Sequence, residues 1–209
     1  MQKKRLLTIM GSAKRPIVRD SFDRADSAIT LGSADTGQAW TKLAGTWGIS
    51  SNKAYLVSNT GQAVAVIDSG YANLNYTVDI TTSPTASRVD CGLVFRATDN
   101  SNFLLLAIEK SATANTIKLW KNDAASFGVL AQDLAAGLAE NTLYTTNVVL
   151  SGNNISIYLN SVLCLSYVLT GDEITKFGTQ TKIGIRVNYG GSADDKGTRF
   201  DNLVAYINP

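Results

Sequence analysis

Short runs in which apolar and polar residues alternate fill most of the chain after residue 20. Residues 74–80 alternate strictly, and residues 155–159 follow the same pattern. A period of two with one apolar face is what a half-buried β-strand requires. Residues 103–108 are apolar throughout, which is typical of a strand covered on both faces. No segment carries a clear helical stripe, and only Asp172–Lys176 is expected to form a helical turn.

Turn-forming residues separate these runs. Asp99–Asn102 and Ser151–Asn154 are rich in residues that tolerate left-handed backbone, and Asn160-Ser161 has the spacing of a β-hairpin turn. With 209 residues the chain suits a single domain. A series of short antiparallel strands in one domain implies two packed sheets. We therefore predict an all-β sandwich, with a jelly roll as the usual way to protect its sheet edges.

Charge divides the chain into a basic arm and a mildly acidic domain. The chain has 19 basic and 17 acidic residues, and six of the basic ones but none of the acidic ones precede Asp20. We predict an extended N-terminal arm over residues 1–19 and a sandwich domain over residues 20–209. Three interpretations of the arm are open: a disordered tail, a segment that binds the phosphates of a nucleic acid, or a segment that docks on an acidic neighbouring subunit.

The apolar stretch inside the arm favours docking on protein, because a purely electrostatic tail would not need it. Nucleic acid is not the expected partner, because no aromatic residue lies between the six charges. The residues expected to anchor the arm are Lys3, Lys4, Arg5, Leu6, Leu7, Ile9, Lys14 and Arg15.

The absence of histidine from the sequence removes whole classes of chemistry. Without it there is no Ser-His-Asp triad, no Cys-His pair and no histidine-ligated zinc. The two cysteines, Cys91 and Cys164, lie in alternating apolar runs, and we expect buried free thiols in a reducing compartment, with a disulfide as the alternative. No apolar run approaches the length of a membrane span, and the apolar part of the start is too short for a signal peptide. We expect synthesis in the cytoplasm and no membrane partner.

Several segments of the sequence resemble concanavalin A-like (laminin-G-like) jelly-roll domains of tailed-phage structural proteins. The resemblance covers about residues 20–207, and related carbohydrate-binding domains share the same motifs. The residues that carry it are Asp20–Asp26, Leu31-Gly32, Asp35–Trp40, Gly45–Ser50, Cys91–Asp99, Gly184–Arg186 and Arg199–Val204.

The resemblance implies a role in assembly or adhesion. We expect a non-enzymatic virion structural protein, either a capsid decoration or fibre or a tail or baseplate component, made in the host cytoplasm. Its partners would be other virion proteins and further copies of itself, anchored by the arm. The alternative is a carbohydrate-binding module that recognises a polysaccharide on the host surface. Fold alone does not decide between the two.

Catalysis is not expected from the carboxylates. Glucanases of this fold use closely spaced glutamates on one strand, because retaining hydrolysis needs two carboxyl groups beside the sugar bond. The sequence has only Glu109, Glu140 and Glu173, and no Glu-x-Asp-x-Glu arrangement.

Sugar binding needs a flat aromatic side chain and a few fixed polar groups. Trp120 and Tyr158 both face outward by strand parity, and Arg96, Arg186 and Asn188 would join them if they share one sheet face. The alternative is an aromatic residue that faces solvent or an interface. Trp40 and Trp47 are assigned to the core.

No cofactor is expected, apart from a structural calcium ion that related sandwiches hold between their first and last strands. Asp23 lies in the first of the segments that carry the resemblance, and Asp201 lies in the last. The favoured alternative is that these two aspartates cap turns or pair with Arg24 and Arg199.

Overall fold

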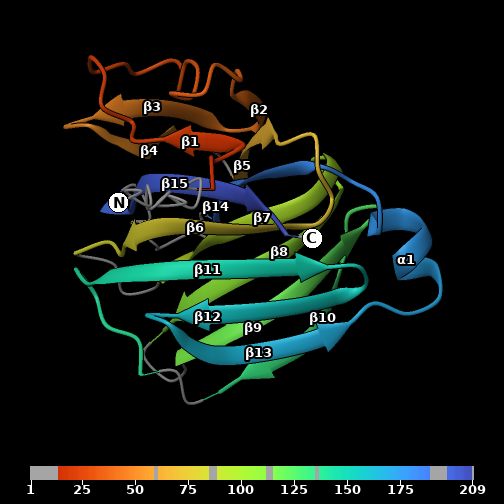
Figure 1. Cartoon of the computed structure of the whole chain (residues 1–209). Coiled ribbons are helices and arrows are strands. Elements are labelled where there is room, and N and C mark those ends of the chain that lie inside the picture. Colours follow the sequence, from red (N-terminus) through yellow and green to blue (C-terminus); the bar gives the residue numbers. More distant parts are fainter. Residues whose placement is uncertain are drawn as a thin grey trace, which may run out of the picture.

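The computed structural model describes residues 14–58, 61–84, 89–111, 115–134, 137–188 and 197–208. These residues form fifteen strands and one short helix, arranged as two antiparallel sheets packed face to face (Figure 1). The elements are β1 (Val18–Asp20), β2 (Thr41–Ala44), β3 (Thr46–Ser50), β4 (Lys53–Ser58), β5 (Gln62–Asp68), β6 (Leu74–Thr81), β7 (Val89–Asp99), β8 (Asn102–Lys110), β9 (Asn115–Asp123), β10 (Ser126–Asp133), β11 (Leu143–Ser151), β12 (Asn154–Leu159), β13 (Val162–Val168), α1 (Asp172–Phe177), β14 (Lys182–Asn188) and β15 (Arg199–Ile207).

The two sheets have different edges. The eight-stranded sheet has the order β13-β12-β11-β6-β15-β4-β3, with β1 paired to β15, and the seven-stranded sheet has the order β10-β9-β8-β7-β14-β5-β2. In Figure 1 the eight-stranded sheet lies in front and α1 crosses between the sheets at one side. The predicted all-β jelly-roll sandwich is therefore confirmed.

Alternate side chains of both sheets fill one core. Along β6 every second residue is buried, which is the pattern expected from residues 74–80. Trp47, Phe95 and Phe200 are among the large side chains at the centre. The predicted hairpin is confirmed as well: Asn160 and Ser161 join β12 to β13 with φ angles of 49° and 67°, the left-handed pair that two-residue hairpins use.

The first and last strands of the described chain pair with each other. Val18 pairs with Ala205 and Asp20 with Leu203, and Val18 is fully buried. The sandwich therefore begins before the predicted boundary at residue 20, because β1 already belongs to the sheet. Lys14 and Arg15 are exposed, and the other predicted anchor residues of the arm lie outside the described residues.

The carboxylate of Asp20 ties the opening segment together. Its Oδ1 accepts hydrogen bonds from the backbone N–H of Phe22 (2.8 Å) and from Nη2 of Arg24 (2.6 Å), and its Oδ2 accepts one from Nε1 of Trp40 (2.7 Å). Burial raises the pKa of this carboxyl group, and the hydrogen bonds from Trp40 and Arg24 oppose that shift. Trp40 is only half-buried and packs against the core from its edge, which corrects its assignment to the core, whereas Trp47 is fully buried as predicted.

Both cysteines are free thiols, which agrees with the prediction. Cys91 is buried, but Cys164 is only partly so, because it lies on the edge strand β13. Among the residues that the structure describes, no helix has the length and apolarity needed to cross a membrane.

We expect Asp20→Ala to lower the free energy of unfolding by about 3 kcal/mol, because it removes a fully buried carboxylate that accepts hydrogen bonds from the partly buried Arg24 guanidinium and from the Trp40 indole N–H. Urea denaturation measures the change. Lys176→Ala breaks the more exposed pair between Lys176 and Asp123 and should cost no more than about 0.5 kcal/mol. Equal losses in the two variants would contradict a central role for Asp20.

Candidate functional site

A cleft of about 430 Å³ opens on the outer face of the seven-stranded sheet. It combines two aromatic rings with two carboxylates, two cations and two amides. The lining residues are Gln62, Asp90, Leu105, Glu109, Lys118, Trp120, Phe127, Arg186 and Asn188.

Strand register brings these residues together from six strands. Asp90 on β7 pairs with Glu109 on β8, and Leu105 on β8 pairs with Trp120 on β9. Asn188 on β14 pairs with Gln62 on β5. Side chains that share a face and a cross-strand row lie within contact of one another, so residues far apart in sequence form one surface.

The bottom of the cleft is kept low by small residues. Between Arg186 and Lys118 the cross-strand row contains Gly92 and Ala107. A Cβ atom at Gly92 would lie 1.8 Å from the carbonyl oxygen of Leu106, so only glycine fits at this position. The row therefore has long side chains at its two ends and small residues at its centre, and the small residues form the floor of the cleft.

Trp120 is held in one orientation by Glu109. The indole Nε1 of Trp120 donates to Oε1 of Glu109 (2.9 Å), and Nζ of Lys118 donates to Oε2 of the same carboxylate (2.7 Å). The same Nζ lies 5.2 Å from the centroid of the Trp120 ring, and Phe127 meets that ring edge-on with centroids 6.2 Å apart. The half-buried indole is thus fixed before any ligand arrives.

A buried ion pair forms the opposite wall. Nη1 of Arg186 donates to Oδ1 of Asp90, and Nδ2 of Asn188 donates to Oδ2 of Asp90 (2.8 Å). The side chains of Arg186 and Asp90 are only 6% and 3% exposed. Separating a charged pair this deeply buried would leave two uncompensated charges, so the two side chains stay together.

Two polar atoms of the cleft have no hydrogen-bond partner within the described part of the chain: Oε1 of Gln62 and Nε of Arg186. Buried polar groups in native proteins are normally satisfied, by ordered water or ligand where protein groups are lacking. One acceptor and one donor, both buried, are therefore unpaired at this wall.

The structure brings together three of the five predicted glycan-binding residues. Trp120, Arg186 and Asn188 all line the cleft. Arg96 does not, and its prediction is corrected. Neighbouring residues of β14 pair with Phe95 and Ala97, which leaves Arg96 as the extra residue of a β-bulge with φ of 49°.

The bulge turns the Arg96 side chain away from the outer face that strand parity predicts. Its Nη2 donates to the carbonyl oxygen of Gly152, in the turn between β11 and β12 of the other sheet. The side chain is 1% exposed, and burial lowers the pKa of Arg96 to about 10.

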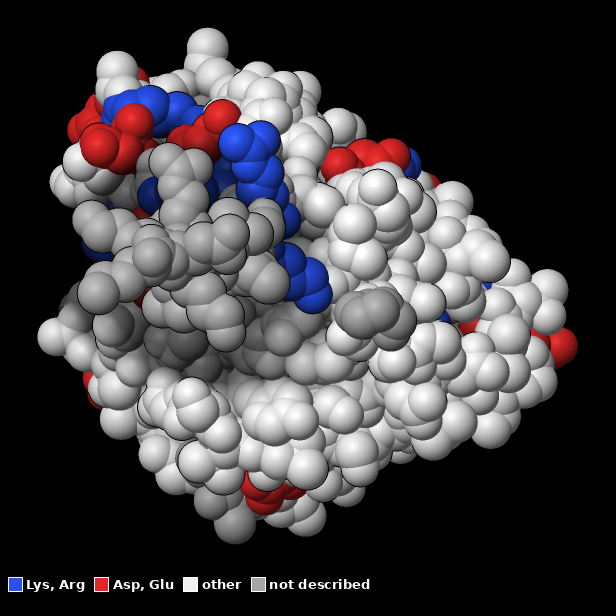
Figure 2. Space-filling model, in the orientation of Figure 1, with Lys and Arg blue, Asp and Glu red and all other residues white. Residues whose placement is uncertain are grey.

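Tyr158 faces outward, as its parity predicts, but from the eight-stranded sheet. It lines a separate hollow with Asn75, Thr77 and Asn147, which puts it on the opposite side of the sandwich from Trp120. Figure 2 shows that charged side chains are scarce on the visible face over β11 and β12, whereas they gather near β1 and β4. The two predicted aromatic residues therefore cannot serve one site.

Sequence reasoning missed Glu109, Asp90 and Lys118. A signal for two of them was present: Glu109 has the parity of Leu105, and Lys118 has the parity of Trp120. The position of Asp90 opposite Glu109 depends on strand register, which no local pattern reveals. The two carboxylates converge from separate strands, a convergence that was not predicted.

The predicted calcium ligands do not form a ligand set. Oδ2 of Asp201 accepts from Nζ of Lys53 (2.5 Å), and Asp23 is exposed. Asp201 therefore pairs with Lys53 and not with Arg199, the alternative considered, while Arg24 pairs with Asp20. Within the described ranges no group of three or more Asp, Glu, Cys or His side chains could hold a metal. Calcium at Asp23 and Asp201 stays a prediction.

No protein-family model and no curated protein sequence matches this chain. Solved structures do match. The carbohydrate-binding module CBM66 from Bacillus subtilis has a TM-score of 0.65 and 20% identity, over 80% of this chain and 94% of that one. Domain 4 of AbnA, a GH43 extracellular arabinanase from Geobacillus stearothermophilus solved with arabinotriose, has a TM-score of 0.58 and 13% identity, over 93% of each chain.

A third match comes from work on endo-acting O-glycanases expressed by prominent members of the human gut microbiota. It has a TM-score of 0.62 and 9% identity, over 93% of this chain and all of that one. At these identities the likeness establishes a shared fold, the concanavalin A-like sandwich.

We expect Glu109→Ala to speed hydrogen exchange of the Trp120 indole N–H by about fivefold, since the lost hydrogen bond is worth about 1 kcal/mol. Exchange followed on the indole ¹H–¹⁵N signals measures this. Glu109→Gln keeps the carbonyl acceptor and should retain most of the protection. Unchanged exchange in Glu109→Ala would mean that packing alone holds the indole.

Proposed function

We propose that this chain is a non-catalytic glycan-binding module whose ligand lies in the cleft on the seven-stranded sheet. The observation that carries the proposal is a half-buried indole, locked by Glu109, beside polar groups that are themselves fixed. A sugar presents an apolar ring face flanked by hydroxyl groups, and a rigid aromatic with convergent donors and acceptors complements both.

The roles divide between the two walls. The Trp120 ring, with Phe127 beside it, offers the apolar surface for a sugar face. On the other wall Arg186 and Asn188 are donors, and Gln62 has an acceptor with no protein partner in the described chain. Because the cleft is already organised, binding immobilises few side chains, which favours affinity.

Similarity to carbohydrate-binding proteins supports this assignment. CBM66 is named a carbohydrate-binding module, and domain 4 of AbnA was solved with arabinotriose. In both cases the match covers more than nine-tenths of the other chain, so the likeness concerns whole modules.

Hydrolysis is the rival use of the same cleft, since Asp90 and Glu109 face each other there and one structural neighbour comes from work on O-glycanases. A hydrolase of this type needs one carboxyl group that delivers a proton. Here Asp90 is bound by Arg186 and Glu109 by Lys118, which makes both of them charge-paired acceptors. We therefore propose binding without turnover.

We expect Trp120→Ala to weaken glycan binding by at least about tenfold, because it removes the stacking surface. A glycan array selects the ligand, and isothermal titration measures its affinity. Tyr158→Ala is the matched control, because it removes an outward aromatic from the opposite sheet and should leave affinity unchanged.

A protein that binds no glycan on the array contradicts the proposal, and so does affinity lost in Tyr158→Ala but kept in Trp120→Ala. Release of reducing ends from the bound glycan, abolished by Glu109→Gln, would favour hydrolysis instead.

Attachment to a larger assembly, such as a tailed-phage particle, is a second candidate function. The edge strand β13 exposes three large apolar side chains, Val162, Leu163 and Val168. Exposed apolar residues gathered on a sheet edge are typical of surfaces that meet another protein. An adhesion module fixed to a particle would combine this role with glycan binding.

The arm predicted from the sequence is a separate anchor for such an assembly, and its test removes residues 2–13, which leaves β1 and the β13 surface intact. We expect the full chain to sediment as an oligomer and the truncated chain as a monomer that still binds glycan. Sedimentation velocity over a range of concentrations measures the difference. Identical sedimentation of both chains would rule out the predicted role of Lys3–Ile9 as an anchor.

A further inference from the structure

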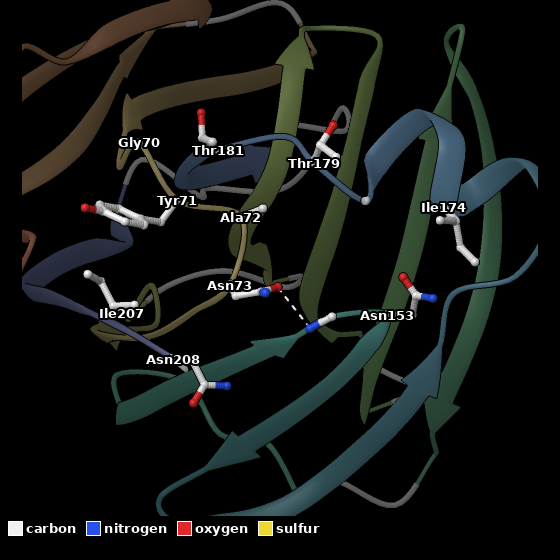
Figure 3. A pocket seen from close by; sticks show the side chains of 12 residues that line it. Gly70, Tyr71, Ala72, Asn73, Asn153, Ile174, Thr179, Thr181, Ile207 and Asn208 are labelled. Atoms are coloured by element: carbon white, nitrogen blue, oxygen red, sulfur yellow. Dashed lines mark hydrogen bonds between the residues drawn. The ribbon is translucent and has the colours of Figure 1, made fainter.

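A second cavity, of about 700 Å³, lies at one end of the sandwich and takes no part in the cleft described above. We call it the end pocket. Three connections and the C-terminal end of β15 build it: the β5–β6 turn, the β11–β12 turn and the segment between α1 and β14. Figure 3 shows Tyr71, Asn73 and Asn208 on one side of it and Asn153 and Ile174 on the other.

Hydrogen bonds between these connections fix the walls. Oδ1 of Asn73 accepts from the backbone N–H of Gly152 (2.9 Å), the contact drawn in Figure 3. Oδ1 of Asp68 accepts from the backbone N–H of Gly70 (2.9 Å) and from the Thr181 hydroxyl (2.7 Å). The end pocket therefore exists before a ligand binds, although loops form it.

The buried Arg96 also holds this end of the sandwich. Its Nη2 donates to the carbonyl oxygen of Gly152, whose N–H is bound to Asn73. The peptide groups of the β11–β12 turn are thus held from both sheets, because Arg96 comes from β7 and Asn73 precedes β6.

Several polar groups on the walls are unused. Among the described residues, the Asn153 amide and the Thr179 hydroxyl have no side-chain hydrogen bond, and Asn208 uses only its Nδ2, which donates to the carbonyl oxygen of Leu150 (3.2 Å). These groups offer both donors and acceptors. They are spaced around an open cavity, and this is the arrangement that recognises hydroxyl groups.

Apolar side chains complete the lining. Tyr71 is 46% exposed, Ile174 is 38% exposed and Ile207 is 37% exposed, all on the wall of the end pocket. No charged residue lines it within the described chain, in contrast to the cleft with its two carboxylates and two cations. A ligand that suits this wall has apolar faces, many hydroxyl groups and no charge.

We propose that the end pocket is a second saccharide-binding site, specific for neutral sugars. The ligand class rests on the proposed function, but the site is separate. Gln62 and Asn188 of the cleft stand at one end of β5 and β14, whereas Asp68 and Lys182 at the other end adjoin the end pocket. Seven residues of strand span about 20 Å, so one monosaccharide cannot fill both sites.

Two sites on one module have a consequence for affinity. A polysaccharide long enough to reach both gains from an effective local concentration, and two separate chains can be bridged. The two sites also differ in charge. The cleft is lined by paired charged side chains, whereas the end pocket is lined by amide and hydroxyl groups.

The test follows backbone amide shifts in ¹H–¹⁵N spectra while neutral oligosaccharides are added. Arabinotriose, xylotriose, cellotriose and a galactose disaccharide serve as probes at about 10 mM, which detects millimolar affinity. We expect one set of shifts at Gly70–Asn73 and Asn153, and a second set around Trp120. Trp120→Ala should remove only the second set.

Matched variants isolate the end pocket. Asn153→Ala and Tyr71→Ala should each lower the affinity measured from the first set of shifts by about fivefold or more, while Asn154→Ala and Tyr71→Phe should leave that affinity unchanged. Asn154 is the next residue, at the start of β12, and its Nδ2 donates to the carbonyl oxygen of Ser151 (3.2 Å). Tyr71→Phe keeps the ring.

Shifts around Trp120 with none at the end pocket would overturn this inference and leave the proposed function standing. Shifts at the end pocket alone would do the reverse. Silence at both sites with every probe would overturn both.

Discussion

Strand alternation is the constraint on which the rest of this structure depends. Along the inner strands of both sheets, alternate side chains belong to one shared core, so only the other face of each of these strands can carry a site. On the seven-stranded sheet much of that outer face is also apolar and buried, with Val64, Val94 and Leu105 fully or almost fully covered. Most polar side chains on such a surface bind one another, as buried polar groups usually do.

The ion pair of Arg186 and Asp90 illustrates this. Burying two charges costs more desolvation energy than an apolar replacement would, so the pair is weak evidence for stability. It makes better sense as a fixed polar wall, supported by Asn188 and facing an indole that Glu109 orients. Rigidity of this kind reduces the entropy lost when a ligand binds.

The cleft and the end pocket reach rigidity by different means. In the cleft, side chains on adjacent strands restrain one another through charge-assisted bonds. In the end pocket, backbone groups of turns are held by Asn73, Asp68 and the re-aimed Arg96. Hydrogen bonds from Thr181 and Gly70 lower the pKa of Asp68, in keeping with a carboxylate that works as a structural acceptor.

Local pattern in the sequence was enough for the strands, the Asn160-Ser161 hairpin, the single helical turn and the outward direction of Trp120 and Tyr158, because parity and turn chemistry act within a few residues. Tertiary structure alone decided which sheet each strand joins, and this separated Tyr158 from Trp120. It also decided the register that faces Asp90 with Glu109, and the bulge that turns Arg96 inward. Although β7 and β8 are consecutive, an irregularity between Phe95 and Asp99 shifts their register, and β7 also pairs with β14, which is distant in sequence, so no local pattern encodes either feature.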